Sequence, residues 1–234
     1  MAFRTRRSFA ASTTSIVLIM MRYITVSVLL CLTFSLRSQT LRFLALGDSY
    51  TIGESVGESE RWPRQLQDTL ISMGYDVKLD IVAKTGWRTD ELIRATRDHG
   101  NAEFDLVSLL IGVNNQYQGR PFEQFQTDLD TLITLALELV SGDTSALFFV
   151  SIPDYGVTPF GLSRYKPNTS SEIDRYNIYI DQKAKNLEVP YVYITDISRI
   201  KNEDLTASDG LHPSALQYSK WIPRILESVG LSED

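Results

Sequence analysis

The residues with the clearest chemical potential are a serine, an aspartate and a histidine. Ser49 ends an apolar run in the stretch GDSYTIG, and Asp209 and His212 stand close together in SDGLHPS. A serine hydroxyl is a weak nucleophile until a base removes its proton, and an imidazole oriented by a carboxylate can be that base. The three residues together therefore predict nucleophilic catalysis, with His212 as the base and Asp209 as its orienting group.

Each of these residues also has an ordinary structural explanation. A serine after a strand can close a turn or cap a helix, and the Asp-Gly pair at residues 209–210 is typical of a turn. The other histidine of the chain, His99, precedes a glycine at the predicted end of a helix, where a solvated side chain is the favoured interpretation. Asp48, beside the candidate nucleophile, is expected to hold the turn through backbone hydrogen bonds rather than to act as an acid.

Acyl transfer also requires hydrogen-bond donors for the negative charge that develops on the carbonyl oxygen. Gly86, in KTGWRTDEL, can present its backbone N–H without a side chain in the way, and the Asn114 amide, in IGVNN, can supply a second donor. The backbone N–H of Ser49 is a third candidate. As alternatives, Gly86 can simply close a turn after a strand, and Asn114 can be a turn or capping residue.

Apolar segments that alternate with helical segments must position these residues. Strands are expected over residues 41–47, 76–86, 104–112, 145–153 and 190–195, and helices over residues 61–74, 88–100, 121–142, 170–188 and 214–230. Short apolar strands separated by helices favour a mostly parallel sheet covered on both faces, here a three-layer α/β/α sandwich of about five strands. Ligands bind at the carboxyl ends of such strands; Ser49 and Asn114 follow predicted strands, and Gly86 stands at the end of one.

The chain resembles the SGNH hydrolases, also called GDSL esterases or lipases, because four motifs of that family occur in order. GDSYTIG resembles the nucleophile block, KTGWRTDEL the second block, IGVNN the third and SDGLHPS the last. The resemblance implies a flavodoxin-like α/β/α fold, a catalytic triad of Ser49, Asp209 and His212, and an oxyanion hole formed by Ser49, Gly86 and Asn114.

The expected function is that of a serine esterase that hydrolyses carboxylic esters through an acyl-enzyme. The expected substrates are short-chain or acetyl esters of carbohydrates or of small alcohols. One alternative is an acyl hydrolase that acts on lysophospholipids or thioesters. The other is a non-catalytic carbohydrate-binding module on the same fold, which the intact set of Ser49, Asp209 and His212 argues against.

Substrate contacts are expected from two segments that follow predicted strands, although aromatic residues after residue 153 can equally pack under their own loop. Tyr155 and Phe160 lie in the irregular stretch after residue 153, and Tyr117 follows the third motif. Asn115 completes this predicted set. It also departs from the family, whose third block usually reads Gly-x-Asn-Asp, so asparagine replaces a charged side chain there. We expect this to change the local contacts rather than to abolish activity, because the implied oxyanion donor is Asn114.

The first 38 residues differ from the rest of the chain, since they contain five arginines and no acidic residue around two apolar runs. From Met21 the sequence MRYITVSVLLCLTFSLRSQ has the basic, apolar and polar regions of a secretory signal peptide. We therefore expect a signal peptide with an upstream extension over residues 1–38, a start at Met21, and a hydrolase domain over residues 39–234. The protein is then secreted or periplasmic; an N-terminal membrane anchor is the alternative.

The charge and the composition of residues 39–234 narrow the expected partners. Removal of the five arginines changes the net charge from −6 to −11, and an acidic domain without a basic cluster is a poor partner for nucleic acid. Two histidines and no cysteine in this region leave too few ligands for a zinc site. We expect a small-molecule or carbohydrate ester as substrate, no cofactor or metal, and membrane contact only through an uncleaved N-terminal segment.

Overall fold

A parallel sheet forms the centre of the structure, a computed structural model that describes residues 40–98, 103–164 and 166–231. Its strands are β1 (Leu41–Gly47), β2 (Val77–Ala83), β3 (Leu106–Leu110), β4 (Leu147–Val150) and β5 (Tyr191–Val192). Their order is β2-β1-β3-β4-β5, and each neighbouring pair is parallel. The predicted sheet is thereby confirmed. The predicted signal segment 1–38 and His99 lie outside the described residues and stay predictions.

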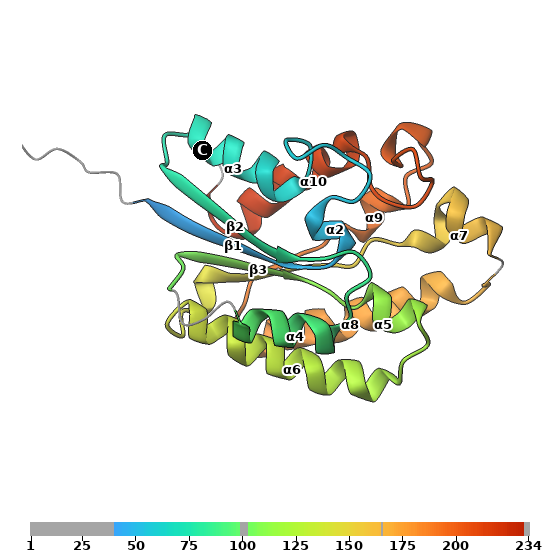
Figure 1. Ribbon diagram of the computed structural model, residues 1–234, viewed down its shortest axis with the longest axis horizontal. Coiled ribbons are helices and arrows are strands. Elements are labelled where there is room, and N and C mark those ends of the chain that lie inside the picture. Colours follow the sequence, from blue (N-terminus) through green and yellow to red (C-terminus); the bar gives the residue numbers. More distant parts are fainter. Residues whose placement is uncertain (1–39, 99–102, 165, 232–234) are drawn as a thin grey trace, which may run out of the picture. The chain divides into compact units, whose positions relative to one another are not determined.

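Helices cover both faces of the sheet, as the apolar strands require. Figure 1 shows α3 (Trp62–Ser72) and α10 (Ala215–Ser228) on one face, and α4 (Thr89–Asp98), α6 (Phe122–Leu139) and α8 (Thr169–Leu187) on the other. On the first face, the rings of Phe43 in β1 and Phe148 in β4 stack with centroids 6.2 Å apart, and Trp62 packs edge-on against Phe148. Helix α10 continues through Pro223 without being split.

Strand β5 is shorter than the predicted segment 190–195 because a side chain takes over its hydrogen bonds. Tyr191 and Val192 pair with the end of β4. Beyond them, the backbone N–H groups of Ile194 and Thr195 do not extend the pairing with β4. They donate instead to the side-chain hydroxyl of Ser151, at 2.8 and 3.1 Å. The chain thus leaves the sheet and enters the short helix α9 (Thr195–Ser198).

Short helices that the sequence did not predict gather at the carboxyl ends of the strands. They include α2 (Ser49–Ile52), α5 (Val113–Tyr117), α7 (Pro159–Ser163) and the 3₁₀ turns η2 (Tyr155–Val157) and η3 (Glu203–Leu205), whereas the 3₁₀ turn η1 (Thr144–Ala146) precedes β4. In Figure 1, α2, α5 and α7 lie at the same edge of the sheet. Among the described residues, no helix is both long enough and apolar enough to cross a bilayer.

Candidate active site

The turn between β1 and α2 places Ser49 at the carboxyl end of β1, an interior strand of the sheet. A Cβ on Gly47 would lie 2.1 Å from the Thr51 hydroxyl and 2.6 Å from a backbone oxygen of β3, so only glycine fits there. Asp48 caps the helix, because its carboxylate accepts the N–H of Tyr50 at 3.0 Å. The predicted structural role of Asp48 is confirmed, and Ser49 is left as the first residue of α2.

His212 and Asp209 form a close pair on the loop that leads into α10. Nδ1 of His212 lies 2.6 Å from Oδ2 of Asp209, and the other carboxylate oxygen accepts the backbone N–H groups of Leu211 and His212 at 2.9 and 3.0 Å. The imidazole also packs against the Tyr50 ring, edge to face, with centroids 5.7 Å apart. These contacts hold the ring so that Nε2 is the nitrogen left for another partner.

The Asp209 carboxylate is held in its charged form. Partial burial by itself would raise its pKa, but hydrogen bonds from His212, from the Ser55 hydroxyl and from two backbone amides outweigh burial and hold the pKa well below its usual range. A carboxylate that stays ionised through the neutral range can fix the tautomer of the imidazole and stabilise the imidazolium when it forms.

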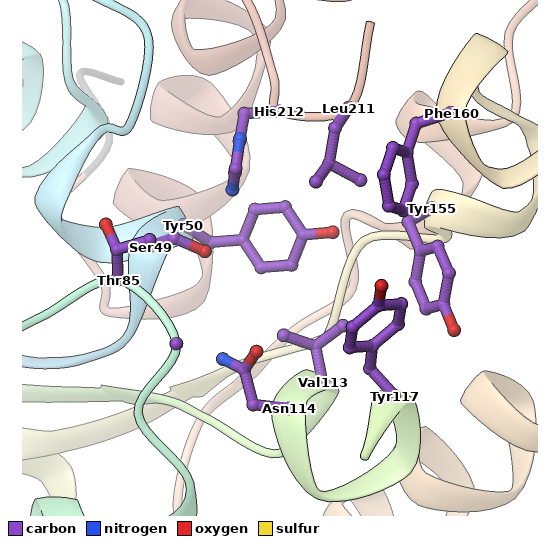
Figure 2. Close-up of a pocket in the computed structure, with 11 residues that line it drawn as sticks. Ser49, Tyr50, Thr85, Val113, Asn114, Tyr117, Tyr155, Phe160, Leu211 and His212 are labelled. Atoms are coloured by element: carbon purple, nitrogen blue, oxygen red, sulfur yellow. The ribbon is translucent and has the colours of Figure 1, made fainter. Parts of the chain in front are cut away.

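Ser49 and His212 line one pocket with a volume of about 190 Å³ (Figure 2). The pocket is lined by Ser49, Tyr50, Thr85, Gly86, Val113, Asn114, Tyr117, Tyr155, Phe160, Leu211 and His212. In the view of Figure 2, His212 and Asn114 reach toward Ser49 from opposite sides, and the aromatic side chains form the far wall. No hydrogen bond joins the Ser49 hydroxyl to any residue within the described ranges. The loops thus bring together three of the four residues predicted to contact substrate, namely Tyr117, Tyr155 and Phe160.

Amide donors face the same pocket. Gly86 has a φ of +84°, which a residue with a side chain rarely adopts, and its N–H donates to no backbone or side-chain acceptor among the residues described. The same holds for the N–H of Ser49 at the start of α2. The Asn114 amide donates one hydrogen to the Trp87 carbonyl at 2.9 Å, which leaves its second hydrogen free. These donors can stabilise a negatively charged oxygen close to Ser49.

We expect Asn114→Ala to lower kcat for ester hydrolysis by about 10²- to 10³-fold, the loss typical of removing one oxyanion donor. The measurement is the steady-state hydrolysis of p-nitrophenyl acetate. Gln118→Ala is the matched control, because that amide donates to the Gly86 carbonyl at 3.3 Å but does not line the pocket. A similar loss in both variants would mean that Asn114 supports the loop rather than the oxyanion.

Asn115 was predicted to contact substrate, and this prediction is wrong. The side chain is fully buried and does not line the pocket. Its oxygen accepts the N–H of Thr89 at 3.1 Å, its amide donates to the Thr89 hydroxyl at 2.8 Å, and that hydroxyl donates to Asp128 at 2.7 Å. Asparagine fits this chain of hydrogen bonds because its side chain both accepts and donates, so Asn115 links α5 to the start of α4.

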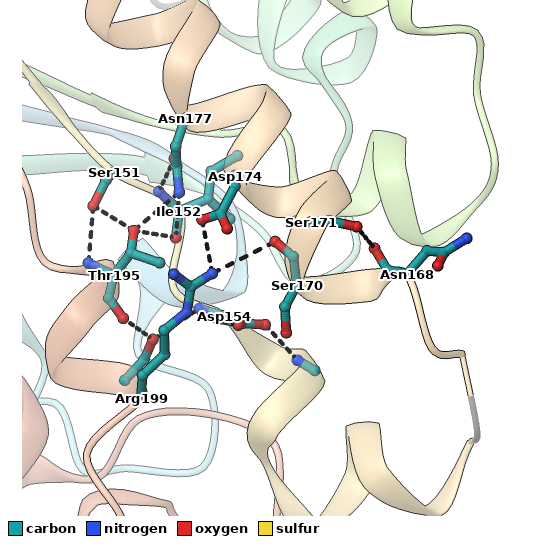
Figure 3. A network of polar contacts seen from close by, with 12 residues as sticks. Ser151, Ile152, Asp154, Asn168, Ser170, Ser171, Asp174, Asn177, Thr195 and Arg199 are labelled. Atoms are coloured by element: carbon teal, nitrogen blue, oxygen red, sulfur yellow. Dashed lines mark hydrogen bonds and ion pairs between the residues drawn. The ribbon is translucent and has the colours of Figure 1, made fainter.

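A polar network of Asp154, Asp174 and Arg199 includes the residue next to Tyr155 in the chain (Figure 3). The carboxylate of Asp154, which is fully buried, pairs with Nε of Arg199 at 2.9 Å and accepts the N–H of Gly156 at 2.8 Å. The same guanidinium reaches Asp174 of α8 at 2.7 Å. Tyr155, next in the chain, donates from its hydroxyl to Gln116 at 2.8 Å. The wall is thus anchored to α5, α8 and the end of α9.

The carboxyl group of Asp48 is fully buried under the turn that carries Ser49, and only one of its two oxygens has a hydrogen-bond partner among the described residues. Burial raises its pKa to about 7, although hydrogen bonds to the backbone N–H of Tyr50 and to its own N–H lower it in part. Ionisation of this group therefore opposes folding, since the carboxyl has its ordinary pKa of 3.8 in the unfolded chain and a pKa of about 7 in the folded protein.

We expect the free energy of unfolding of Asp48→Asn, relative to the parent, to increase as the pH rises from about 4 to about 7. The native state binds the Asp48 proton more tightly than the unfolded state, so the parent loses stability over this window, by at most about 4 kcal/mol. Urea unfolding at a series of pH values measures the difference. Asp80→Asn, at an exposed position of β2, controls for the change of charge. A difference that does not vary with pH would contradict the prediction.

Some residues of the site had no sequence signal. Thr85, Val113 and Leu211 line the pocket only because they neighbour the motif residues. The Ser55 hydroxyl donates to Asp209 at 2.7 Å across 154 positions of the sequence. Contacts of this kind depend on how the loops pack together at the edge of the sheet, so no local sequence pattern predicts them.

The fold described above, together with the similarity to known proteins, defines the protein as a carboxylic ester hydrolase of the α/β/α type. It belongs to the GDSL-like lipase/acylhydrolase family, whose model matches residues 45–220. An arylesterase from Vibrio mimicus is 25% identical over 205 residues, which cover 87% of this chain and 94% of that protein.

Solved structures share the fold at lower sequence identity. The psychrotrophic esterase EstA from Pseudoalteromonas sp. has a TM-score of 0.60 at 19% identity, over 81% of this chain and 96% of that one. An acetyl xylan esterase from Geobacillus stearothermophilus has a TM-score of 0.59 at 15% identity, over 83% and 96%. These similarities support the arrangement of layers and the order of strands described above.

Proposed function

We propose that the protein is a serine esterase that hydrolyses short-chain esters through an acyl-enzyme at Ser49. The observation that carries the proposal is the position of a carboxylate-bound imidazole, His212, in the same pocket as Ser49 and its unpaired hydroxyl. Free amide donors in that pocket supply the second requirement for acyl transfer.

The proposed reaction has two balanced halves. The Ser49 oxygen attacks the ester carbonyl while Nε2 of His212 takes the hydroxyl proton, and the carbonyl oxygen accepts hydrogen bonds from Ser49 N–H, Gly86 N–H and the Asn114 amide. The C–O bond to the alcohol then breaks, and His212 returns the proton to the departing oxygen. Water attacks the acyl-enzyme in the same way, which releases the carboxylic acid and restores the serine.

Pocket size and lining favour a short acyl group. The volume of about 190 Å³ lies below the roughly 300–1,000 Å³ typical of sites for drug-sized ligands. Apolar side chains form the wall away from Ser49, which suits an acetyl or another short alkyl chain and offers little room for the long chain of a lysophospholipid. The similarity to an arylesterase and to an acetyl xylan esterase supports acetyl or other short esters of carbohydrates or small alcohols.

The test combines covalent labelling with a panel of substrates. Diethyl p-nitrophenyl phosphate should inactivate the protein with one equivalent bound, and peptide mass mapping should place the label on Ser49. Among p-nitrophenyl acetate, butyrate and octanoate, kcat/KM should be highest for acetate or butyrate. Labelling at another residue, or no hydrolysis of any ester, would refute the proposed function.

We expect Phe160→Ala to shift the preference toward longer acyl chains. Phe160 lies in the far wall of the pocket, so its removal leaves space for added methylene groups (Figure 2). The ratio of kcat/KM for octanoate to that for acetate should rise by about tenfold or more, the discrimination typical of one or two methylene groups. Leu162→Ala, on the same helix but 69% exposed, is the control and should leave the ratio unchanged. An unchanged ratio in Phe160→Ala would place the acyl group elsewhere.

A further inference from the structure

Two consecutive residues after the nucleophile helix contact the two other loops of the site. The Ser55 hydroxyl donates to Oδ2 of Asp209 at 2.7 Å. The hydroxyl of Thr85, which precedes the candidate oxyanion glycine, donates to the Glu54 carboxylate. Residues 54 and 55 therefore link the turn that carries Ser49 to the acid–histidine loop on one side and to the oxyanion loop on the other.

The same segment is bound directly to the nucleophile. The backbone N–H groups of Gly53 and Glu54 both donate to the carbonyl of Ser49, at 3.1 and 3.0 Å. A displacement of residues 54 and 55 would therefore be transmitted to Ser49 through two short backbone contacts. Neither Glu54 nor Ser55 lines the pocket, so a contact with substrate does not account for them.

Ser55 adopts a conformation that serine normally avoids. Its φ is +67°, in the left-handed region that favours glycine. The other described non-glycine residues with positive φ, Ser141 and Glu188, lie at the ends of α6 and α8, where this conformation commonly terminates a helix. Ser55 lies beyond the end of α2, which Gly53 already caps. A strained residue on an exposed loop persists when its surroundings hold it, and such residues concentrate at functional sites.

The hydrogen bond from Ser55 reaches Asp209 from a distant segment of the chain, unlike the backbone hydrogen bonds that Asp209 accepts. The backbone N–H groups of Leu211 and His212 bind Oδ1, and they belong to the same short loop as Asp209 itself. Ser55 binds Oδ2, the oxygen that also contacts Nδ1 of His212. It is therefore the contact that ties the acid–histidine pair to the segment carrying the nucleophile.

We propose that Glu54 and Ser55 are positioning residues, which together set the placement of the Asp209–His212 loop and of the Thr85–Gly86 loop relative to Ser49. This inference rests on the proposed function, because the groups it positions are those of the acyl-transfer reaction. The left-handed conformation of Ser55 directs its side chain to Asp209 while the preceding side chain reaches Thr85.

The test is a pair of substitutions at Ser55 that separate stability from activity. Ser55→Gly removes the hydroxyl and suits a positive φ, so Tm should stay within about 3 °C of the parent or rise, while kcat should fall about tenfold. Ser55→Thr keeps the hydroxyl but places a β-branched residue in the left-handed region, so kcat should be largely retained while Tm falls. KM should change little in either variant.

A pH profile distinguishes positioning from a general structural effect. Without the Ser55 hydroxyl, the Asp209 carboxylate has one donor fewer and interacts more strongly with a protonated imidazole. The acid limb of kcat/KM should therefore move to higher pH in Ser55→Gly. Glu54→Ala should lower kcat severalfold without moving this limb, and Glu54→Gln should be milder because its amide oxygen still accepts the Thr85 hydroxyl.

Ser141→Gly is the matched control. Ser141 also has a positive φ, of 54°, but it lies between α6 and β4 at the amino ends of the strands. Its replacement should preserve or raise Tm without changing kcat or the pH profile. If the parent is labelled at Ser49 and Ser55→Gly keeps the parental kcat and acid limb, the positioning role is wrong and the esterase proposal stands. If the parent neither hydrolyses esters nor reacts with the phosphate, both proposals fall together.

Discussion

Replacing Ser49 with alanine is expected to reduce ester hydrolysis to near the background rate, a loss of about 10⁶-fold in kcat. The variant removes the only protein atom that bonds to the acyl carbon in the proposed reaction. The fold should be unaffected, because the residue is 5% exposed and its hydroxyl forms no hydrogen bond with the described residues. Steady-state hydrolysis of p-nitrophenyl acetate and a urea unfolding curve measure the two quantities on the same preparation.

The control for this substitution is Ser219→Ala, which removes an exposed hydroxyl of α10 that donates a hydrogen bond to the Leu216 carbonyl. It should keep the parental kcat. Rapid mixing adds a second measurement, because an acyl-enzyme whose hydrolysis limits the rate gives a burst of p-nitrophenol equal to the concentration of sites. More than about one hundredth of the parental kcat remaining in Ser49→Ala, with the fold intact, would exclude the acyl-enzyme at Ser49.

The second large effect is expected from Asp209→Asn, which should lower kcat by about 10⁴-fold at neutral pH. Both carboxylate oxygens of Asp209 accept hydrogen bonds, from two backbone amides on one side and from Ser55 and His212 on the other. The asparagine side chain has one oxygen and one NH₂ group, so its NH₂ group must face either the two backbone N–H groups or the Ser55 and His212 side. Where it faces the imidazole, Nδ1 becomes the acceptor and the ring proton moves to Nε2, which can no longer take the Ser49 proton.

The pH dependence of this variant follows from the state of the parental carboxylate. The folded pKa of Asp209 lies below its usual range, so the group contributes stability above its unfolded pKa and loses it only as the pH falls into the acid range. Between pH 5 and 8 the parent thus keeps its carboxylate, and the deficit of Asp209→Asn should persist over that whole interval. Asp204→Asn, on the exposed turn η3, is the control. A deficit below about tenfold would show that the orientation of His212 does not depend on this carboxylate.

Much of the architecture could be predicted because it depends on local patterns. The segments that became β1, β3 and β4 are mostly apolar, with Arg42 and Ser108 as polar interruptions, and a strand buried on both faces is apolar over most of its length. The long helices α6 and α8 follow equally regular patterns. The strand order had no such signal in the sequence, because it depends on how the crossover connections pack. The length of β5 had none either, because it depends on the Ser151 hydroxyl, which accepts hydrogen bonds from the backbone N–H groups of Ile194 and Thr195.

The short helices were missed for a related reason. Helices α2, α5, α7 and α9 span four or five residues each, too few for a hydrophobic period to appear. They form because side chains supply caps or because neighbouring loops hold them. In α7, for example, the Thr158 hydroxyl caps the first turn and the Phe160 N–H donates to the Gly210 carbonyl at 2.9 Å. Such helices are products of the packed loops rather than of their own sequence.

By itself, the sequence determined which chemical groups are present and the turns that display them. Asp48 and Ser49 specify the turn that displays the proposed nucleophile, and Asp209 and His212 specify the proposed acid–base pair, because the contacts within each group lie within four residues along the chain. The tertiary structure decided what these groups meet. It buried Asn115 against Thr89 and brought Ser55 to Asp209 across 154 positions, and it closed the pocket with Tyr155 and Phe160. Contacts between distant loops depend on strand order and loop packing, and these emerge only when the whole sheet has formed.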